Sequence, residues 1–464
     1  MPKHDQDIEN VRKSVGWVYD DLRWVTEKEA ATAQRERREL LDFLQDRVNF
    51  SFSGTKPHTG SLSRGCRICG EGFWSCMFIN QLCSADCFFC PQDRKVTKDD
   101  LPCTGHGMVF REMEDYVDFL AYAGYRGVGF SGGEPLLAFD KLLAYIKRIR
   151  ERHGNDLYLW LYTNGDLVDQ EKLITLRDHG LNEIRFNICA DNYGLESVKK
   201  AVGVIDTVTV EIPAIPEDFE TVKKSMALMQ ELGVSHLNLH QLLVTMYNYR
   251  ELKARNYTFL HQESISVLES ELTALRLMKY AVENNITLPI NYCNSFYKSQ
   301  FQVKGNRERI ASPVMEEREE LTEAGYIRKL EVQGEGEAGS MVRGHELQKF
   351  DLGGCHLVVS YYEPSLKSAL ASPETGPGSF TLIQDKIAIG RILSARLELT
   401  EAVAINGFYQ LFFEKKDETT VRRDLLANCQ AKTRDDLRNM METINRIISL
   451  EKYEQTGKGF PDIY

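Results

Sequence analysis

From about residue 77, short runs rich in β-branched and aromatic residues alternate with amphipathic helical stretches, in six or seven repeats. This alternation is typical of parallel β/α units, in which each helix returns the chain to the same edge of a sheet. The expected strands are FINQL after Cys76, then residues 127–131, 157–163, 183–188, 207–212, 236–242 and 287–293. The pattern predicts an α/β fold that closes into a full or partial barrel, with its chemistry at the carboxyl ends of the strands.

The regions on either side differ from this pattern. Residues 1–76 are expected to form a helical extension over about 50 residues, followed by a cysteine-containing loop, because WVYDDLRWVTEKEAATAQRERRELLDFL is rich in helix formers. Residues 77–304 are the predicted TIM-like (β/α)6 barrel, with helices that include 113–123 and 262–284. Residues 305–464 are predicted to be a smaller C-terminal α+β domain, with strands in RILSARLEL and FYQLFFE and a helix in TRDDLRNMMETINRIISLEKYE.

Charge and hydropathy argue against several classes of protein. The 57 basic and 68 acidic residues give a net charge of -11, which opposes nonspecific attraction to nucleic acid. No apolar run approaches the roughly 20 residues that span a bilayer, and the polar start MPKHDQDIEN lacks the apolar segment of a signal peptide. We therefore expect a cytoplasmic protein with neither a membrane nor a nucleic acid as its partner.

The cysteines are clustered, with six of the eleven between Cys66 and Cys90. A reducing cytosol disfavours a disulfide framework, so this clustering points to metal. The densest part is Cys83-Ser-Ala-Asp-Cys87-Phe-Phe-Cys90, just after the first predicted strand. Thiolates at this density suit iron-sulfur clusters or zinc. Three ligands would leave one iron of a four-iron cubane open to a substrate or cofactor.

The spacing CxxxCxxC, with the aromatic Phe89 before the last cysteine, resembles the signature of the radical S-adenosylmethionine (radical SAM) superfamily. The resemblance implies that Cys83, Cys87 and Cys90 hold a 4Fe-4S cluster that reductively cleaves S-adenosylmethionine. It further implies methionine and a 5'-deoxyadenosyl radical as products, an oxygen-sensitive enzyme, and an external electron donor such as flavodoxin or ferredoxin.

Other strand ends carry matching motifs. Gly132-Gly133-Glu134-Pro135 is similar to the GGEP motif of the superfamily, which implies contact with the amino group of S-adenosylmethionine; a plain turn would explain the glycines but not the conjunction of motifs. Thr163-Asn164-Gly165 resembles the TNG found at the third strand end in many members. By position alone, the resemblance places Asn187 at the ribose and the segment from Asn238 to Leu242 at the adenine.

A narrower resemblance covers roughly residues 60–330. The segments that carry it are GCRIC at 65–69, FINQLCSADCFFCP, VEIPAIP, LNLHQL, NYCNSFYK and NRERIA. They look like a little-characterised archaeal and bacterial group related to pyruvate formate-lyase activating enzymes. This likeness implies a fold and a cofactor, but it names no substrate.

Cys66, Cys69 and Cys76 precede or begin the first strand and could bind zinc, a second iron-sulfur cluster, or no metal. Cys76 is expected near the opposite end of that strand from Cys83, which argues against a site shared with the first cluster. The scattered cysteines, at 103, 189, 355 and 429, are expected to be structural.

Cys293 and His240 are the candidate catalytic residues. Cys293 ends a predicted strand beside Tyr292 and Asn294, so it could be a substrate-side thiol, a ligand completing a site with Cys66 and Cys69, or a buried small hydrophobe. His240 lies near the end of its strand and could be a proton donor, a substrate contact or a core histidine whose hydrogen bonds are satisfied.

Three functions remain open from the sequence. The first is hydrogen abstraction from an unidentified small molecule or peptide, and the second is installation of a glycyl radical on a partner protein. The third is a non-catalytic zinc or iron-sulfur module, which would leave the GGEP and TNG matches unexplained.

Overall fold

The computed structural model describes residues 8, 11–12, 16, 18–92, 102–262, 264–311, 314–317, 319–333, 356–369, 381–393, 453 and 456–463. Its chain divides into two compact units. One comprises residues 7–305 with 368–381 and 458–464, and the other comprises 1–6, 306–367 and 382–457. The larger unit carries the cysteine signature, the GGEP and TNG motifs and every cysteine apart from Cys355 and Cys429, which lie outside the described residues; the segment NRERIA at 306–311 belongs to the smaller unit.

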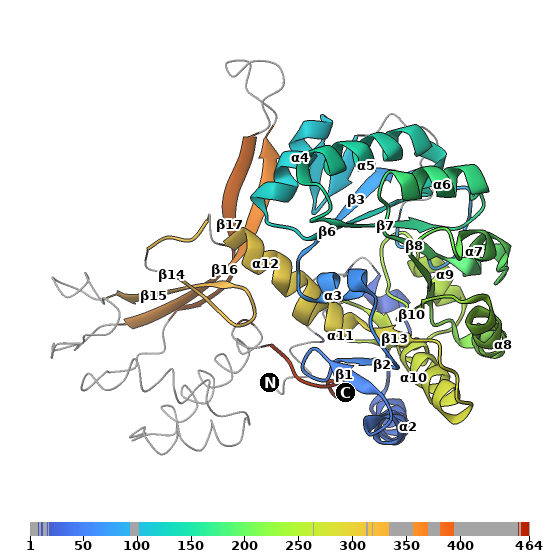
Figure 1. The fold of residues 1–464 in the computed structure, drawn as a ribbon. Helices are drawn as coiled ribbons and strands as arrows, with labels where there is room; N and C mark the ends of the chain where they lie inside the picture. Colours follow the sequence, from blue (N-terminus) through green and yellow to red (C-terminus); the bar gives the residue numbers. More distant parts are fainter. Residues whose placement is uncertain are drawn as a thin grey trace. The chain divides into compact units, whose positions relative to one another are not determined.

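The larger unit is built on an eleven-stranded sheet, in the order β1-β2-β13-β10-β9-β8-β7-β6-β3-β4-β5 (Figure 1). Seven neighbouring strands run parallel: β3 Trp74–Asn80, β6 Gly127–Gly132, β7 Tyr158–Thr163, β8 Glu183–Phe186, β9 Thr207–Pro213, β10 His236–His240 and β13 Ile290–Cys293. They are the seven strands expected from the sequence, and the α/β class is confirmed. The hydrogen-bond ladder of the described strands does not close, so the barrel is a partial one.

Two short antiparallel hairpins extend the sheet at its ends. The first consists of β1 Asn49–Ser51 and β2 Lys56–His58, and it pairs with β13. The second consists of β4 Cys103–Gly105 and β5 Met108–Phe110, and it pairs with β3. Neither hairpin was predicted from the sequence, because strands of three residues are too short to show a period.

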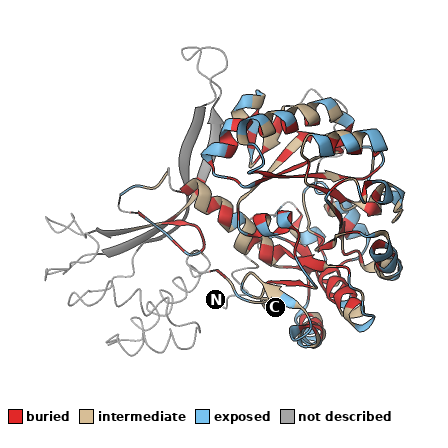
Figure 2. Ribbon diagram, viewed as in Figure 1, coloured by how far each residue is buried: buried red, intermediate tan, exposed pale blue. Residues whose placement is uncertain are grey.

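Helices cover the outer face of the sheet, and the short α3 lies on its inner face (Figure 1). The helices of the larger unit are α2 Glu27–Gln45, α3 Arg64–Gly70, α4 Met113–Tyr122, α5 Phe139–His153, α6 Gln170–Asp178, α7 Glu196–Ala201, α8 Phe219–Leu232, α9 Tyr249–Ala254, α10 Leu268–Glu283 and α11 Ser295–Tyr297. Helix α12 Lys304–Ala311 belongs mostly to the smaller unit, which includes residues 306–367. Ile68 of α3 packs with Tyr158 and Trp160 of β7, which fixes α3 against the strands. Buried residues concentrate in the strands and in the helix faces turned toward them (Figure 2).

The N-terminal helix is shorter than the expected 50 residues. It begins at Glu27 because the Thr26 hydroxyl accepts a hydrogen bond from the Glu29 backbone, while the Glu29 carboxylate accepts one from the Thr26 backbone. This reciprocal cap ends the preceding segment, in which Trp24 instead forms a β-bridge with Phe259. No helix in the described part of the chain combines the length and apolar character required to cross a membrane.

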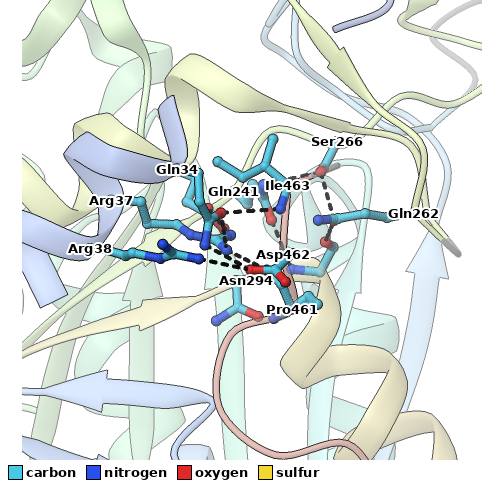
Figure 3. A network of polar contacts seen from close by, with 12 residues as sticks. Gln34, Arg37, Arg38, Gln241, Gln262, Ser266, Asn294, Pro461, Asp462 and Ile463 are labelled. Carbon is cyan, nitrogen blue, oxygen red and sulfur yellow. Dashed lines mark hydrogen bonds and ion pairs between the residues drawn. The ribbon is translucent and has the colours of Figure 1, made fainter. Parts of the chain in front are cut away.

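The last described residues of the chain pack into the larger unit (Figure 3). Arg37 of α2 forms a buried ion pair with Glu271 of α10 at 3.0 Å and also donates to the backbone carbonyl of Pro461. The backbone N–H of Ile463 donates to Gln34 at 3.2 Å, and the ring of Phe460 stacks on Tyr292. Residues 458–463 therefore complete the packing between α2, α10 and β13.

The smaller unit contains a four-stranded sheet in the order β14-β15-β16-β17. Its strands are β14 Glu319–Leu321, β15 Ile327–Gln333, β16 His356–Ala369 and β17 Thr381–Leu393. The expected strand in FYQLFFE and the expected terminal helix lie outside the described residues, and only the first three residues of RILSARLEL fall inside, at the end of β17.

His106, in the hairpin between β4 and β5, should make the stability of the protein pH-dependent. Burial lowers the pKa of its imidazole to about 4, and the ring stacks on Tyr125. The unfolded chain binds this proton near pH 6.5, so stability should fall as the pH decreases from 6.5 toward 4, by at most about 3 kcal/mol from this residue. Denaturant unfolding across this range should show a shallower pH slope for His106→Asn, in which the side chain does not titrate; equal slopes would contradict the assignment. Asparagine also tolerates the positive φ of 52° at this position.

Candidate functional site

The three cysteines of the signature lie in the loop that follows β3, at the carboxyl edge of the parallel sheet. The Cys90 backbone N–H donates to the Cys87 carbonyl at 3.0 Å, forming a tight turn between these two ligand positions. Cys83 is exposed, Cys87 and Cys90 are half-buried, and none of the three forms a disulfide. Their thiols are therefore available to a ligand from outside the chain.

The end of β6 is hydrogen-bonded directly to the segment that leads into Cys83. The Gly133 backbone N–H donates to the Asn80 carbonyl at 3.1 Å, and the Glu134 N–H donates to the Leu82 carbonyl at 2.6 Å. A Cβ atom at Gly133 would overlap the Leu82 carbonyl, and one at Gly132 would overlap that of Asn80. Gly132 also has a φ of +123°, which disfavours any other residue. Gly132 and Gly133 are thus needed for the end of β6 to pack closely against the segment that leads into Cys83.

Glu134 turns its side chain inward, where it joins two strand ends. Its carboxylate accepts hydrogen bonds from the backbone of Leu136 at 3.0 Å, the hydroxyl of Thr163 at 2.9 Å and the backbone of Asn164 at 2.7 Å. Burial raises the pKa of Glu134, and these donors partly offset that effect. The side chain of the GGEP motif therefore clamps the end of β6 to the end of β7, and the buried Pro135 begins the next helical turn.

Asparagines from β7 and β8 reach the cysteine loop. Asn164 Nδ2 donates to Ser84 Oγ at 2.8 Å and lies 3.9 Å from Cys83 Sγ. Asn187 Nδ2 lies 3.9 Å from Cys87 Sγ, while its Oδ1 is buried and has no hydrogen-bond partner within the described structure. The structure thus brings together Cys83, Cys87, Asn164 and Asn187, and it leaves one buried acceptor for a ligand.

The aromatic residues of the signature anchor the loop on its other side. Phe88 and Phe89 pack against a hydrophobic cluster that includes Leu242, and the Phe89 carbonyl accepts from Asn248 Nδ2 at 3.0 Å. Thr245 similarly donates to the Pro91 carbonyl at 3.3 Å. Leu242, predicted at the adenine, thus belongs to the cluster against which Phe89 packs. Neither Asn248 nor Thr245 was predicted from the sequence, because no motif marks their loop.

A polar network covers the inner face of the sheet at β8, β9 and β10. Arg185 lies 2.9 Å from both Glu183 and Glu211, and Glu211 also accepts from His240 Nε2 at 3.0 Å and Asn238 Nδ2 at 2.8 Å. Burial acts to raise the pKa of Glu211, but His240 and Arg185 outweigh it and hold that pKa well below its usual range. The signal that could have revealed the network is charge at alternating positions of otherwise apolar strands.

His240 has both ring nitrogens engaged. Burial, followed by the positive charge of Lys298, lowers the pKa of its imidazole. Lys298 Nζ lies 3.1 Å from Nδ1 and Nε2 faces Glu211, so the neutral ring accepts from the lysine and donates to the carboxylate. His240 therefore connects Lys298 to the network. Asn238, also predicted at the adenine, is likewise held in this network, since its Oδ1 accepts from Asn291.

The remaining cysteines separate into two places. Cys66, Cys69 and Cys293 lie close enough that their charges would interact, and burial raises the pKa of Cys66 and, more strongly, of Cys69. Asn238 Nδ2 contacts Cys66 Sγ at 3.4 Å, and Gln302 Nε2 contacts Cys69 Sγ at 2.9 Å. Cys76 is placed near Ser131, and burial raises its pKa to about 12.

In the described part of the chain, no three His, Cys, Asp or Glu side chains are positioned to enclose one metal ion. A four-iron cubane requires a different arrangement of ligands from a single ion, because each thiolate binds a different iron and the cysteine sulfurs lie further apart. The loop at residues 83–90 carries three cysteines that form no disulfide, with the Asn164 and Asn187 amides beside them and a buried Asn187 oxygen that has no partner in the described structure. These residues fit an iron-sulfur cluster with one open position.

Comparison with known proteins gives a consistent picture. Residues 77–254 match the family model of the radical SAM superfamily. The chain is 28% identical over 276 residues, 57% of its length, to a Methanocaldococcus jannaschii protein named as a glycyl-radical enzyme activating enzyme, of which the match covers 72%. It is also 28% identical over 180 residues, 38% of its length, to a Methanosarcina acetivorans protein named as a GTP 3',8-cyclase, of which 47% is covered.

Solved structures with weaker similarity include the radical S-adenosylmethionine methyltransferase TsrM of Kitasatospora setae. The sequence identity is 19%, the match covers 40% of this chain and 39% of that one, and the TM-score is 0.31. Streptococcus suis SuiB bound to its precursor peptide gives 12% identity, 58% and 62% coverage, and a TM-score of 0.35. The chain thus spans less than two thirds of each of these structures.

Proposed function

Because residues 77–254 belong to the radical SAM superfamily, we propose that this protein cleaves S-adenosylmethionine reductively and abstracts hydrogen from a substrate. Membership of this superfamily implies an enzyme with a 4Fe-4S cluster and S-adenosylmethionine as cofactors. The observation that carries the proposal is the meeting of four strand ends at the cysteine loop: Asn80, Gly133, Asn164 and Asn187 all lie at or beside it.

When bound, the cluster supplies one electron to S-adenosylmethionine, and the cleavage yields methionine and a 5'-deoxyadenosyl radical. Cys83, Cys87 and Cys90 would hold the cluster, and the amides of Asn164 and Asn187 would stabilise the negative charge on the cysteine sulfurs. The clamp made by Glu134 keeps the ends of β6 and β7 in fixed register beside these ligands. The electron donor in this proposal is a flavodoxin or ferredoxin.

The experiment is anaerobic reconstitution of the full chain with iron and sulfide, followed by reduction with dithionite in the presence of S-adenosylmethionine. We expect about four irons per chain and the formation of 5'-deoxyadenosine, detected by mass spectrometry. Bound zinc in place of iron, together with no 5'-deoxyadenosine, would instead support a structural metal module and contradict the proposal.

A second candidate is an activating enzyme that installs a glycyl radical on a protein, favoured by the name of the M. jannaschii relative. It predicts that the abstracted hydrogen comes from the Cα of a protein glycine. When the enzyme is given an extract of cells grown on α-deuterated glycine, deuterium should then appear in 5'-deoxyadenosine, and the macromolecular fraction of the extract should be its source. Transfer from the filtrate alone would instead indicate a small-molecule substrate.

A further inference from the structure

Two lysines on the inner side of the sheet carry charge that no nearby carboxylate neutralises. Lys56 of β2 is 1% exposed, and its ammonium lies 4.1 Å from the centre of the Tyr297 ring. Lys298 contacts the neutral ring of His240. Within the described residues, neither lysine has a carboxylate within ion-pair distance, although buried ammonium groups are normally paired.

The neighbouring carboxylates are already committed to other partners. Glu183 and Glu211 both pair with Arg185, and Glu211 also accepts hydrogen bonds from His240 and Asn238. Three cationic side chains therefore face two carboxylates, which leaves an excess positive charge on this inner surface. One further anion would balance it.

The fold places both lysines level with the ends of the catalytic strands. His240 and Cys293 are paired as the last residues of β10 and β13. The antiparallel pairing of His58 with Asn291 then brings Lys56 level with Cys293. Lys298 begins the π-helix Lys298–Val303, a rare conformation that frequently occurs at functional sites.

Two further observations indicate that a ligand can bind here. The side chain of His240 is 26% exposed, so the network is reachable from outside. Asn291 Oδ1, on the adjacent strand, is buried with no hydrogen-bond partner in the described structure. A ligand with an anionic group and a nearby donor would satisfy both the lysines and this oxygen.

We propose that Lys56 and Lys298 bind an oxyanion group of the substrate, a carboxylate or a phosphate, on the inner face of β10 and β13. This inference rests on the proposed function, since it names the chemical class of the substrate acted on at the cysteine loop. His240 acts as a positioning residue, because it holds Lys298 through Nδ1 and is itself fixed by Glu211.

The test measures thermal unfolding of the reconstituted full chain with added malonate or inorganic phosphate, against sodium chloride at equal ionic strength. Either anion should raise the melting temperature of the wild type, and the better one identifies the group. Lys56→Met and Lys298→Met should each require at least about tenfold more anion for the same rise in melting temperature, whereas Lys298→Arg should respond at the wild-type concentration. The control is Lys279→Met, which alters a lysine of α10 that pairs with Glu283.

A purely structural role gives a different result. Lys56→Met removes an uncompensated buried charge, so the variant without anions should melt at the same or a higher temperature than the wild type. A lower melting temperature combined with an unchanged anion response would overturn the proposal. So would loss of S-adenosylmethionine binding in equilibrium dialysis, because the lysines would then serve the cofactor. Anion binding is read without turnover, so its failure is separable from failure to form 5'-deoxyadenosine.

Discussion

Alanine in place of Cys83, Cys87 or Cys90 is expected to reduce bound iron and 5'-deoxyadenosine formation to the background of each assay. All three thiols belong to the same loop at a strand end, and the described structure has no further cysteine in that loop. Cys189 lies near Cys87, but burial raises the pKa of its thiol to about 12, which disfavours the thiolate that a replacement ligand would need. Iron content after reconstitution and product formation under dithionite are the two measurements.

The matched control for these variants is Cys103→Ala. Cys103 is buried in β4, where its thiol lies 3.7 Å from the Ile79 carbonyl, so its loss should reduce stability slightly and leave the iron content unchanged. Full iron content and wild-type product formation in any of the three signature variants would sink the assignment of the cluster to this loop.

The second large effect is expected from Gly133→Ala, which adds a single methyl group. Its Cβ would overlap the Leu82 carbonyl, so the hydrogen bonds from Gly133 to Asn80 and from Glu134 to Leu82 must give way. The strain should destabilise the fold by about 1–3 kcal/mol and displace the segment that enters Cys83. Iron content and product formation should fall further than this loss of stability alone explains. Denaturant unfolding measures the loss of stability, and the reconstitution assay measures iron content and product formation.

Gly154→Ala provides the comparison, since Gly154 has a φ of +57° but nothing within 4 Å of an added Cβ. It should cost about 1–3 kcal/mol in conformation, because its ψ of -138° disfavours other residues too, and leave the cluster site intact. If Gly133→Ala binds iron and cleaves S-adenosylmethionine like the wild type, close packing of the β6 end does not position the cysteine loop.

The sheet was predictable because parallel strands buried on both faces appear in the sequence as continuous apolar runs. The run LYLWLYT gave β7 to within one residue, and GVGFS gave β6 to within one. The motifs at their ends, Gly133 and Asn164, could be located for the same reason: the carboxyl end of a strand is visible wherever an apolar run meets polar residues.

The inner polar network could not be predicted because its contacts join residues far apart in the sequence. Lys56 and Lys298 are separated by more than half of the chain, and neither belongs to a recognisable motif. A lysine in a sequence indicates a solvated side chain by default, and only the pairing of β2 with β13 shows that Lys56 is buried. Helix α3 was missed too, since its seven residues are too few to display a helical period.

The packing of residues 458–463 against Arg37, Gln34 and Tyr292 has a consequence for how the protein is made. The larger unit includes both α2 and residues 458–463, and residues 306–367 and 382–457 of the smaller unit lie between them in the sequence. Residues 458–463 are synthesised after residues 306–457, so Arg37 lacks its hydrogen bond to the Pro461 carbonyl until the intervening region has been translated. We therefore expect the larger unit to gain its full stability, and its proposed cluster to assemble most efficiently, only once residues 458–463 have been translated and packed.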